Sequence, residues 1–407
     1  MGIAVKIISV VLVTVMLAAL MTGCTEQVSA LVIAEKQDEV IQRNNEFAWE
    51  LFKVLNKEDA DENVFISPLS ISTALTMTLN GANGTTEEAM KEALFYKGLD
   101  MAAINSGNKY LAERLTRMNK DVTIKIGNSI WIKDQFPVKK SFVDVNKDMF
   151  NALIENADFS KDSTVDKINK WIGNATEGMI DKMIDPPIPE DTLMYLINAV
   201  YFKGDWTKPF DPNRTFKGQF TTKDGQTKEM DMMTKSESME YYEENGVKAV
   251  RLPYGKDKSV SMTLILPAEN TDIDAFIQEM NVSKWNEIRE GLIERNEVRL
   301  QIPKFKMEYG IKELEAALTE LGMGEAFSDQ ADFSGIADAR LAIGTVKHKA
   351  VIDVHEEGSE AAGVTVVGIR LTSVNIDMPQ FIADRPFVFV IADDTDNNIL
   401  FMGKMVQ

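Results

Sequence analysis

The spacing of apolar residues predicts several helices, most of them in the first half of the chain. Apolar positions with a period near 3.6 residues favour an amphipathic helix over 40–55. A Ser-Pro-Leu-Ser segment opens a second helix over 67–79, and the capping residues of 85–88 begin a third. Two further helices are expected over 163–184 and 311–321.

Alternating or uncharged apolar runs predict strands, most of them in the second half. Residues 122–132 alternate between apolar and polar, and residues 193–201 are nearly uncharged, as is typical of a buried central strand. Early helices followed by antiparallel strands indicate an α+β protein. No repeat or flexible linker divides the chain, which predicts one domain with interleaved sheets. Shorter strands are expected at 247–252, 261–266, 298–302, 350–354, 387–391 and 400–405.

The segment 356–367 combines the composition of a central strand with the setting of an exposed loop. No charge or proline occurs between Glu360 and Arg370. Valine and threonine at 364–367 favour strand. A proline-containing polar stretch, 372–379, follows, so the segment can also be carried as a loop. We therefore expect it to take part in a conformational change. Its small alternate residues are Ser359, Ala361, Gly363 and Thr365.

The bulk composition excludes some classes of partner. The chain has 407 residues, of which 44% are hydrophobic, and carries a formal net charge of −19. A protein of this charge is repelled by nucleic acid and by anionic membrane surfaces. We expect neither as a partner.

The amino terminus is predicted to be an export signal. Residues 1–23 have a lysine, an apolar run and small residues, followed by Cys24. This order is typical of a lipoprotein signal peptide, and the apolar run is short for a membrane-spanning helix. Lipid attachment to Cys24 is expected, with plain secretion or an uncleaved anchor as alternatives. Residues 24–38 then form a polar tether. Cys24 is the only cysteine, so no disulfide can form within the chain.

The residues that could support hydrolysis are few. His348 and His355 are the only histidines, and no Gly-x-Ser-x-Gly motif occurs. A hydrolase triad would have to use one of these histidines, and His348 lies between two lysines. One cysteine and two histidines also leave too few ligands for zinc. We predict that the protein is not an enzyme and has no metal site.

Two other ligand motifs are incomplete. Gly363 and Gly368 have the spacing of a phosphate-binding loop, but Ile369-Arg370 stands where lysine and a hydroxyl residue are needed. Asp394, Asp396 and Asn398 resemble a calcium loop in which Ile399 replaces the required glycine. A hairpin turn is the better interpretation of that segment. We expect no cofactor.

Many short blocks resemble the serpin family, in the family's order and at its spacing, from about Phe47 to Lys404. Any one block alone would be a weak match. The matching blocks are Asn63–Ile71, Asn128–Trp131, Ile168–Trp171, Asn198–Trp206, Leu252–Tyr254, Ala331–Ile336, Glu356–Gly363, Asp384–Phe387 and Phe401–Lys404.

The resemblance implies a fold and a mechanism. It implies one serpin domain over 39–407, with three β-sheets, eight or nine helices and an exposed reactive loop over 357–378. In that mechanism a protease cleaves the loop and forms an acyl-enzyme, and insertion of 358–371 into the main sheet as an added strand then traps the protease. Serine proteases are the implied partners, some cysteine proteases are possible ones, and the protein is expected to be a monomer.

The family register locates the hinge and the cleaved bond. The hinge is Glu356, Glu357, Gly358, Ser359, Glu360, Ala361, Ala362 and Gly363. The reactive bond is then Thr372-Ser373, which suits an elastase-like or subtilisin-like protease. Arg370-Leu371 offers a trypsin-like protease an alternative bond. Small alternate hinge residues are required because their side chains must enter a packed core.

The resemblance also assigns roles to single residues. Ser67, Ser70, Asn198 and His348 match the family's shutter, a polar cluster that controls opening of the main sheet. Trp206 matches the breach, where insertion begins, and Lys304 matches a breach ion pair with Glu356. His355 has no assigned role. A non-inhibitory serpin acting as a cell-surface binding protein is the alternative function. Export as a lipoprotein, or release by secretion, is the expected localisation.

Overall fold

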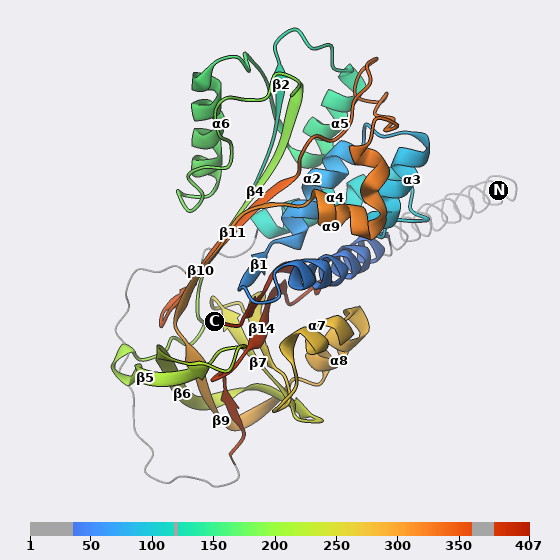
Figure 1. The fold of residues 1–407 in the computed structure, drawn as a ribbon. Coiled ribbons are helices and arrows are strands. Elements are labelled where there is room, and N and C mark those ends of the chain that lie inside the picture. The colour runs from blue at the N-terminus through green and yellow to red at the C-terminus, as the bar shows by residue number, and fades with distance from the viewer. Residues whose placement is uncertain (1–35, 118–120, 360–377) are drawn as a thin grey trace, which may run out of the picture.

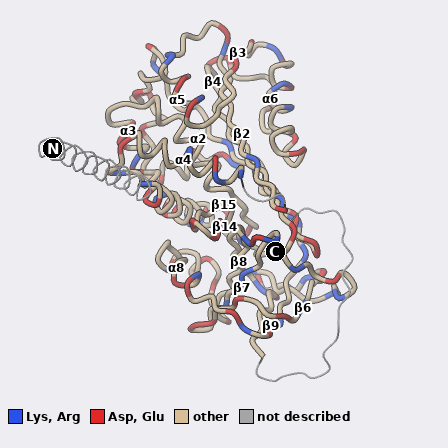
Figure 2. Tube along the Cα trace, turned by 180° about the vertical axis from the view of Figure 1, so that it is seen from behind, with Lys and Arg blue, Asp and Glu red and all other residues tan. Residues whose placement is uncertain are grey.

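The computed structural model describes residues 36–117, 121–359 and 378–407. Its helices and strands form the α+β fold that the sequence predicts (Figure 1). Most helices surround one six-stranded sheet in one half of the molecule, and a second sheet fills the other half. Acidic and basic residues are scattered over both halves (Figure 2).

The six-stranded sheet has the order β10-β11-β12-β4-β2-β3. Its longest pairing joins β2 to β4, antiparallel from Val122↔Gly204 to Ile132↔Met194. The edge strand β3 runs parallel to β2. The two-residue strand β12 connects β11 to β4. The strands are β2 (Val122–Lys133), β3 (Leu153–Ala157), β4 (Met194–Asp205), β10 (Phe305–Glu313), β11 (Lys347–Val354) and β12 (Gly358–Ser359).

The other sheet contains nine strands, with the path β1-β15-β14-β8-β7-β6-β9-β13 and β5 paired to β6. Strand β6 is long enough to pair with β5 and β9 and, at its end, with β7. Strand β6 thereby joins two groups of strands into one sheet. The described residues therefore form two hydrogen-bonded sheets, where three were expected from the family resemblance. The strands are β1 (Val64–Ile66), β5 (Phe216–Thr221), β6 (Thr227–Glu244), β7 (Val247–Tyr254), β8 (Val260–Leu266), β9 (Ile293–Pro303), β13 (Gln380–Ile382), β14 (Phe387–Asp393) and β15 (Ile399–Met405).

Four helices lie on the two faces of the six-stranded sheet, whereas α7 and α8 lie beside the other sheet (Figure 1). Helices α2, α4 and α5 lie on one face and α6 on the other, where Ile168 and Ile172 are buried with Trp131. A helix over 36–58 is the first described element. The others are α2 (Pro68–Leu79), α3 (Gly84–Ala93), α4 (Met101–Thr116), α5 (Lys140–Phe150), α6 (Asp162–Ala175), α7 (Ile273–Glu279), α8 (Val282–Glu290) and α9 (Glu315–Leu318), with short turns at Pro212–Arg214, Thr319–Met323 and Gly324–Phe327.

Two predicted helices are shorter in the structure. Helix α6 ends at Ala175, well before residue 184, because Glu177 and Gly178 have left-handed backbone angles that stop a helix. The predicted helix 311–321 is right from Glu315 onward, as α9 and the π-helical turn after it, and wrong at its start. Its first residues extend β10, where Lys312 pairs with His348, and Gly322 at φ 105° interrupts the helical turns that follow α9. The turn between β14 and β15 spans Asp394 to Asn398, as predicted.

Candidate functional site

Two residues of the predicted hinge segment, Gly358 and Ser359, form the strand β12 of the six-stranded sheet. Ser359 pairs with Val354 of β11 on one side and with Gly204 of β4 on the other. Gly358 pairs with Asp205, and its carbonyl accepts the backbone N–H of His355 at 3.0 Å. The first two residues of the predicted inserting segment therefore already lie between β11 and β4.

The packing around β12 explains its small residues. A Cβ atom on Gly358 would lie 2.2 Å from the carbonyl oxygen of Gly204, so no side chain fits there without moving the backbone. Ser359 is 2% exposed, and its hydroxyl lies 2.8 Å from the hydroxyl of Tyr254, which is fully buried. Only small side chains can therefore occupy these two positions of the sheet.

Trp206 holds the chain just before β12. Its backbone N–H donates to the carbonyl of Glu357 at 2.8 Å, and its indole Nε1–H donates to the carbonyl of His355 at 3.0 Å. The indole also stacks on Tyr254, with 4.4 Å between ring centroids. This is the position that the sequence assigns to the breach, and His355 contributes its backbone to it.

Glu356 is held by two side chains. Its carboxylate accepts hydrogen bonds from Lys304 Nζ at 2.9 Å and from Thr215 Oγ1 at 2.8 Å. Burial alone would raise the pKa of Glu356, but these two hydrogen bonds outweigh it and lower the pKa below its ordinary value. The predicted Lys304–Glu356 pair therefore forms, and Thr215 completes it.

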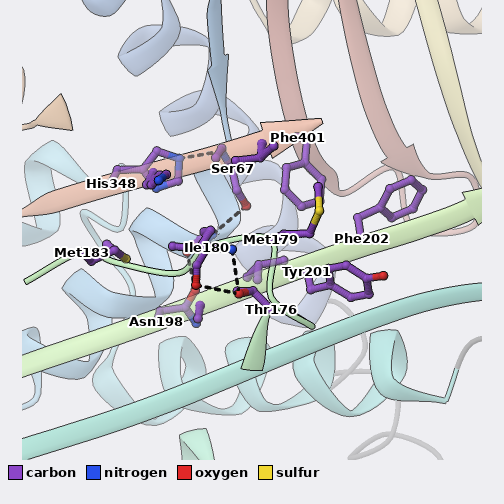
Figure 3. A pocket seen from close by; sticks show the side chains of 16 residues that line it. Ser67, Thr176, Met179, Ile180, Met183, Asn198, Tyr201, Phe202, His348 and Phe401 are labelled. Carbon is purple, nitrogen blue, oxygen red and sulfur yellow. Dashed lines mark hydrogen bonds between the residues drawn. The ribbon is translucent and has the colours of Figure 1, made fainter. Parts of the chain in front are cut away.

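A small cavity lies between β4 and β11, next to the part of these strands that β12 joins. It has a volume of about 30 Å³ and is lined by residues of both strands, among them Asn198 and His348. The segment that follows α6 covers it, with Thr176, Ile180 and Met183 on its wall (Figure 3). In the described residues, β4 and β11 are neighbours through β12.

Hydrogen bonds connect the two sides of this cavity through α2. The backbone N–H of Ser67 donates to His348 Nε2 at 3.1 Å, and the Ser67 hydroxyl caps α2 by accepting the N–H of Ser70 at 3.3 Å. Ser70 donates to Asn198 Oδ1, and Asn198 donates to Asn128 Oδ1 at 2.6 Å. The four predicted shutter residues thus lie in one chain of contacts from β11 to β4.

His348 is buried and neutral in this arrangement. Its side chain is 5% exposed, and burial lowers its pKa to about 4. Because Nε2 accepts a hydrogen bond from Ser67, the ring proton belongs on Nδ1. A neutral acceptor of this kind cannot serve as a solvent-accessible catalytic base.

Several predicted site residues lie outside the described residues. These are Cys24 with the signal segment 1–23, the hinge residues Glu360, Ala361, Ala362 and Gly363, and both candidate bonds, Arg370-Leu371 and Thr372-Ser373. Among the described residues, no cluster of histidine, cysteine and acidic side chains is placed to hold a metal ion. No described helix has the length and hydropathy needed to cross a membrane.

Four residues of the site had no role assigned from the sequence: Thr215, His355, Tyr254 and Asn128. Tyr254 ends an apolar strand pattern, which indicates a buried ring. A buried tyrosine hydroxyl needs a hydrogen-bond partner, and this was the only signal in the sequence for its role. Asn128 lies in a strand with alternating polarity and donates to the carbonyl of Phe150 at 2.6 Å. Neither partner is near in sequence, so only the fold identifies them.

Comparison with known proteins decides the family. The family model described as "Serpin (serine protease inhibitor)" matches residues 42–407. The chain belongs to the serpin family. The serpin fold is that of protease inhibitors, although some members are non-inhibitory, and most members are extracellular or secreted.

Three similar serpins cover almost the whole chain. The leukocyte elastase inhibitor of Bos taurus is 32% identical, over 89% of this chain and 97% of its own. The native crystal structure of tengpin, a thermophilic serpin, has a TM-score of 0.82 at 34% identity and covers 91% of this chain and 94% of its own. Human thyroxine-binding globulin complexed with thyroxine has a TM-score of 0.81 at 28% identity and covers 91% and 99%.

Proposed function

We propose that this serpin inhibits a serine protease by trapping it after cleavage of the reactive loop. The protease cuts Thr372-Ser373, and residues 358–371 then insert as a strand between β11 and β4. The observation that carries the proposal is β12, because Gly358 and Ser359 already pair with both of these strands. Insertion continues a pairing that has begun.

The energy of such a step is sufficient to disable a bound enzyme. A new strand of about a dozen residues adds roughly ten ladder hydrogen bonds, each worth about 1 kcal/mol net. Their sum is comparable to the stability of a whole domain, about 5–15 kcal/mol. The cavity between Asn198 and His348 would lie on the path of a strand that inserts between β4 and β11. Opening the sheet there requires the Ser67–Ser70–Asn198 contacts to rearrange.

The target class follows from the loop sequence. Threonine before the cut suits a protease with a small primary pocket, either elastase-like or subtilisin-like. Arg370 gives a trypsin-like protease a second bond, and cleavage there shortens the inserting segment by two residues. The leukocyte elastase inhibitor among the relatives supports an elastase-like target.

The test is formation of a covalent adduct. Residues 24–407 are incubated with an elastase-like protease, a subtilisin and a trypsin, and the products are boiled in detergent and separated by mass. We expect an adduct of the summed mass with at least one of them, and none when its catalytic serine is replaced by alanine. Sequencing the released carboxy-terminal fragment identifies the bond, since it begins at Ser373 or at Leu371. Cleavage without an adduct contradicts the proposal.

The same experiment distinguishes the alternative function. Thyroxine-binding globulin shows that this fold also serves as a ligand carrier, which favours a binding protein as the second candidate. A non-inhibitory serpin is cleaved in the loop but releases the protease. The small residues at Gly358 and Ser359 support the inhibitory function, because a carrier does not need a hinge that can insert.

We also propose that the chain is exported and held at the outer face of the membrane by lipid on Cys24. The signal-like segment 1–23 supports this placement, and the tether 24–38 would separate the serpin domain from the membrane. Labelled fatty acid should be incorporated into the exported chain and not into a Cys24→Ser variant. Equal labelling of the two contradicts lipidation of Cys24, and release of unlabelled protein indicates plain secretion.

A further inference from the structure

Strands β4 and β11 are joined in the described residues only where β12 lies between them, through Gly358 and Ser359. On their other sides, β4 pairs with β2 and β11 pairs with β10. The remaining edge of each strand therefore faces the space between β4 and β11. Backbone N–H and C=O groups along such an edge need hydrogen-bond partners, because a buried group without one costs free energy. A molecule bound in this space can supply them.

The cavity beside Asn198 and His348 lies in this space, since residues of both strands line it. Its volume of about 30 Å³ exceeds the roughly 10–15 Å³ that one water molecule needs. Five polar side chains contribute to the lining: Ser67, Ser70, Thr176, Asn198 and His348. Cavities with apolar walls stay dry, whereas polar ones of sufficient size hold water. The size and the lining of this cavity therefore suit one or two water molecules.

His348 has an unused hydrogen-bond donor at this cavity. Its Nε2 atom accepts the backbone N–H of Ser67 at 3.1 Å, which places the ring proton on Nδ1. Among the described residues, none accepts a hydrogen bond from Nδ1. The His348 side chain is 5% exposed, so it has little contact with bulk solvent. A buried N–H without an acceptor is costly, which indicates an acceptor inside the cavity.

Asn198 offers a contact from the opposite strand. Its Oδ1 atom accepts the hydroxyl of Ser70, and its Nδ2 atom donates to Asn128 Oδ1 at 2.6 Å. An amide oxygen has two lone pairs, so Oδ1 can accept a second hydrogen bond. Figure 3 shows His348 and Asn198 on the two strands that border the cavity. The free donor of β11 and the free acceptor of β4 are complementary only through a molecule that both accepts and donates.

We propose that an ordered water molecule occupies this cavity and bridges β11 to β4. The water oxygen accepts the Nδ1–H of His348, and one water hydrogen is donated to Oδ1 of Asn198. The bridge connects the two strands at a point where β12 does not reach. Water bridges of this kind are nearly as favourable in enthalpy as direct hydrogen bonds. Binding of this water does not depend on whether the protein traps a protease.

Nuclear magnetic resonance of ¹⁵N-labelled histidine tests the donor, because the chain has only two histidines. The intact protein, residues 24–407, is measured at pH 7, where His348 is neutral because its pKa is about 4. A His355→Gln variant assigns the signals. We expect His348 to carry its proton on Nδ1 and this proton to show a cross-peak with a bound water, of the sign that excludes simple proton exchange. A proton on Nε2, or an Nδ1 proton without this cross-peak, overturns the proposal.

A crystal structure of the intact protein tests the position of the water. We expect density for a water molecule within about 3.2 Å of both His348 Nδ1 and Asn198 Oδ1. An empty cavity, or a protein group that accepts from Nδ1, overturns the proposal. This measurement and the cross-peak both use the parent protein, so they decide the proposal even where a variant does not fold.

A variant then tests the contact from β4. Asn198→Leu removes the acceptor and should lose both the water density and the cross-peak. Asn296→Leu, at an exposed position of β9, is the matched control and should keep both. Circular dichroism checks the fold of each variant. A water that stays in place in folded Asn198→Leu contradicts the bridge between the two strands.

Discussion

The hydroxyl of Ser359 lies 2.8 Å from the hydroxyl of Tyr254. Both side chains are buried, Ser359 in β12 of the six-stranded sheet and Tyr254 in β7 of the other sheet. This contact holds Ser359, near the start of the predicted reactive loop, inside the fold. The Trp206 indole, stacked on Tyr254, supports it from the other side. Gly358 and Ser359, the first two residues of the proposed inserting segment, therefore already lie in the sheet, and we expect the contacts around Ser359 to affect how easily insertion proceeds.

Replacing Ser359 by arginine should abolish trapping while leaving loop cleavage intact. The site is 2% exposed, and a buried, unpaired charge costs several kcal/mol, about 3–5 kcal/mol in comparable cases. The protease then completes hydrolysis before insertion can proceed. Adduct yield on a detergent gel measures the effect. Ser163→Arg, at an exposed position of α6, is the matched control and should trap normally. A normal adduct yield in Ser359→Arg contradicts the hinge assignment.

The Ser359–Tyr254 hydrogen bond should show a measurable coupling energy. We expect Ser359→Ala and Tyr254→Phe each to lower the free energy of unfolding of the intact protein by about 1–2 kcal/mol. Each substitution removes one hydroxyl and leaves the other one buried without its hydrogen-bond partner. Urea unfolding of the double variant should reveal a coupling of about 1 kcal/mol between them. Additive effects would mean that the two hydroxyls do not interact in solution.

The stability of the intact protein should fall as the pH drops from about 6.5 to about 4. His348 has a folded pKa of about 4, below its ordinary value of 6.5, because it is buried. In that window the unfolded chain binds a proton that the folded protein does not, so acid favours unfolding. The stabilisation, present in full above pH 6.5, is about 3 kcal/mol and is lost on acidification.

A His348→Gln variant provides the control for this pH dependence. Glutamine can still accept the N–H of Ser67 but does not titrate. Urea unfolding at a series of pH values should therefore give a flatter profile for the variant between pH 6.5 and 4. An identical slope in the two proteins would show that other groups, and not His348, cause the acid sensitivity.

Loss of the Lys304–Glu356 ion pair should have little effect on the free energy of unfolding or on the yield of the protease adduct. Lys304 is 44% exposed, so solvent screens the pair, and Thr215 still donates to Glu356 when the lysine is absent. We expect Lys304→Met to change the free energy of unfolding by less than about 1 kcal/mol and to leave adduct yield near normal. A loss of trapping in this variant would show that the pair controls insertion and does more than hold Glu356.

The sequence predicted the elements that local pattern determines. The strand β2 begins at Val122 as its alternation predicts, and α2 begins at Pro68 with Ser67 as its cap. Strands that form because a strand distant in the sequence pairs with them were missed or were predicted as another element. The residues around Lys312 have a helical pattern but extend β10, because β11 offers a partner strand. The short strand β3 is stabilised by pairing with β2 and carries little signal of its own.

The candidate site shows the same division. The hinge composition and the family blocks predicted which residues matter, including Ser67, Asn198 and His348. The contacts between them could not be read from one sequence, since Ser67 and His348 are far apart along the chain. The role of Tyr254 at Ser359 depends on where β7 packs against β12.

The central claim is that the intact fold is less stable than the cleaved form with its loop inserted, and thermal unfolding tests this difference most directly. The loop is nicked near Thr372 by a protease that is then inactivated, and the thermal unfolding of nicked and intact protein is compared by circular dichroism. We predict that the nicked protein melts at a much higher temperature, because the segment that follows Ser359 has joined the sheet between β11 and β4. Equal melting temperatures would contradict the proposed mechanism, since no insertion would then follow cleavage.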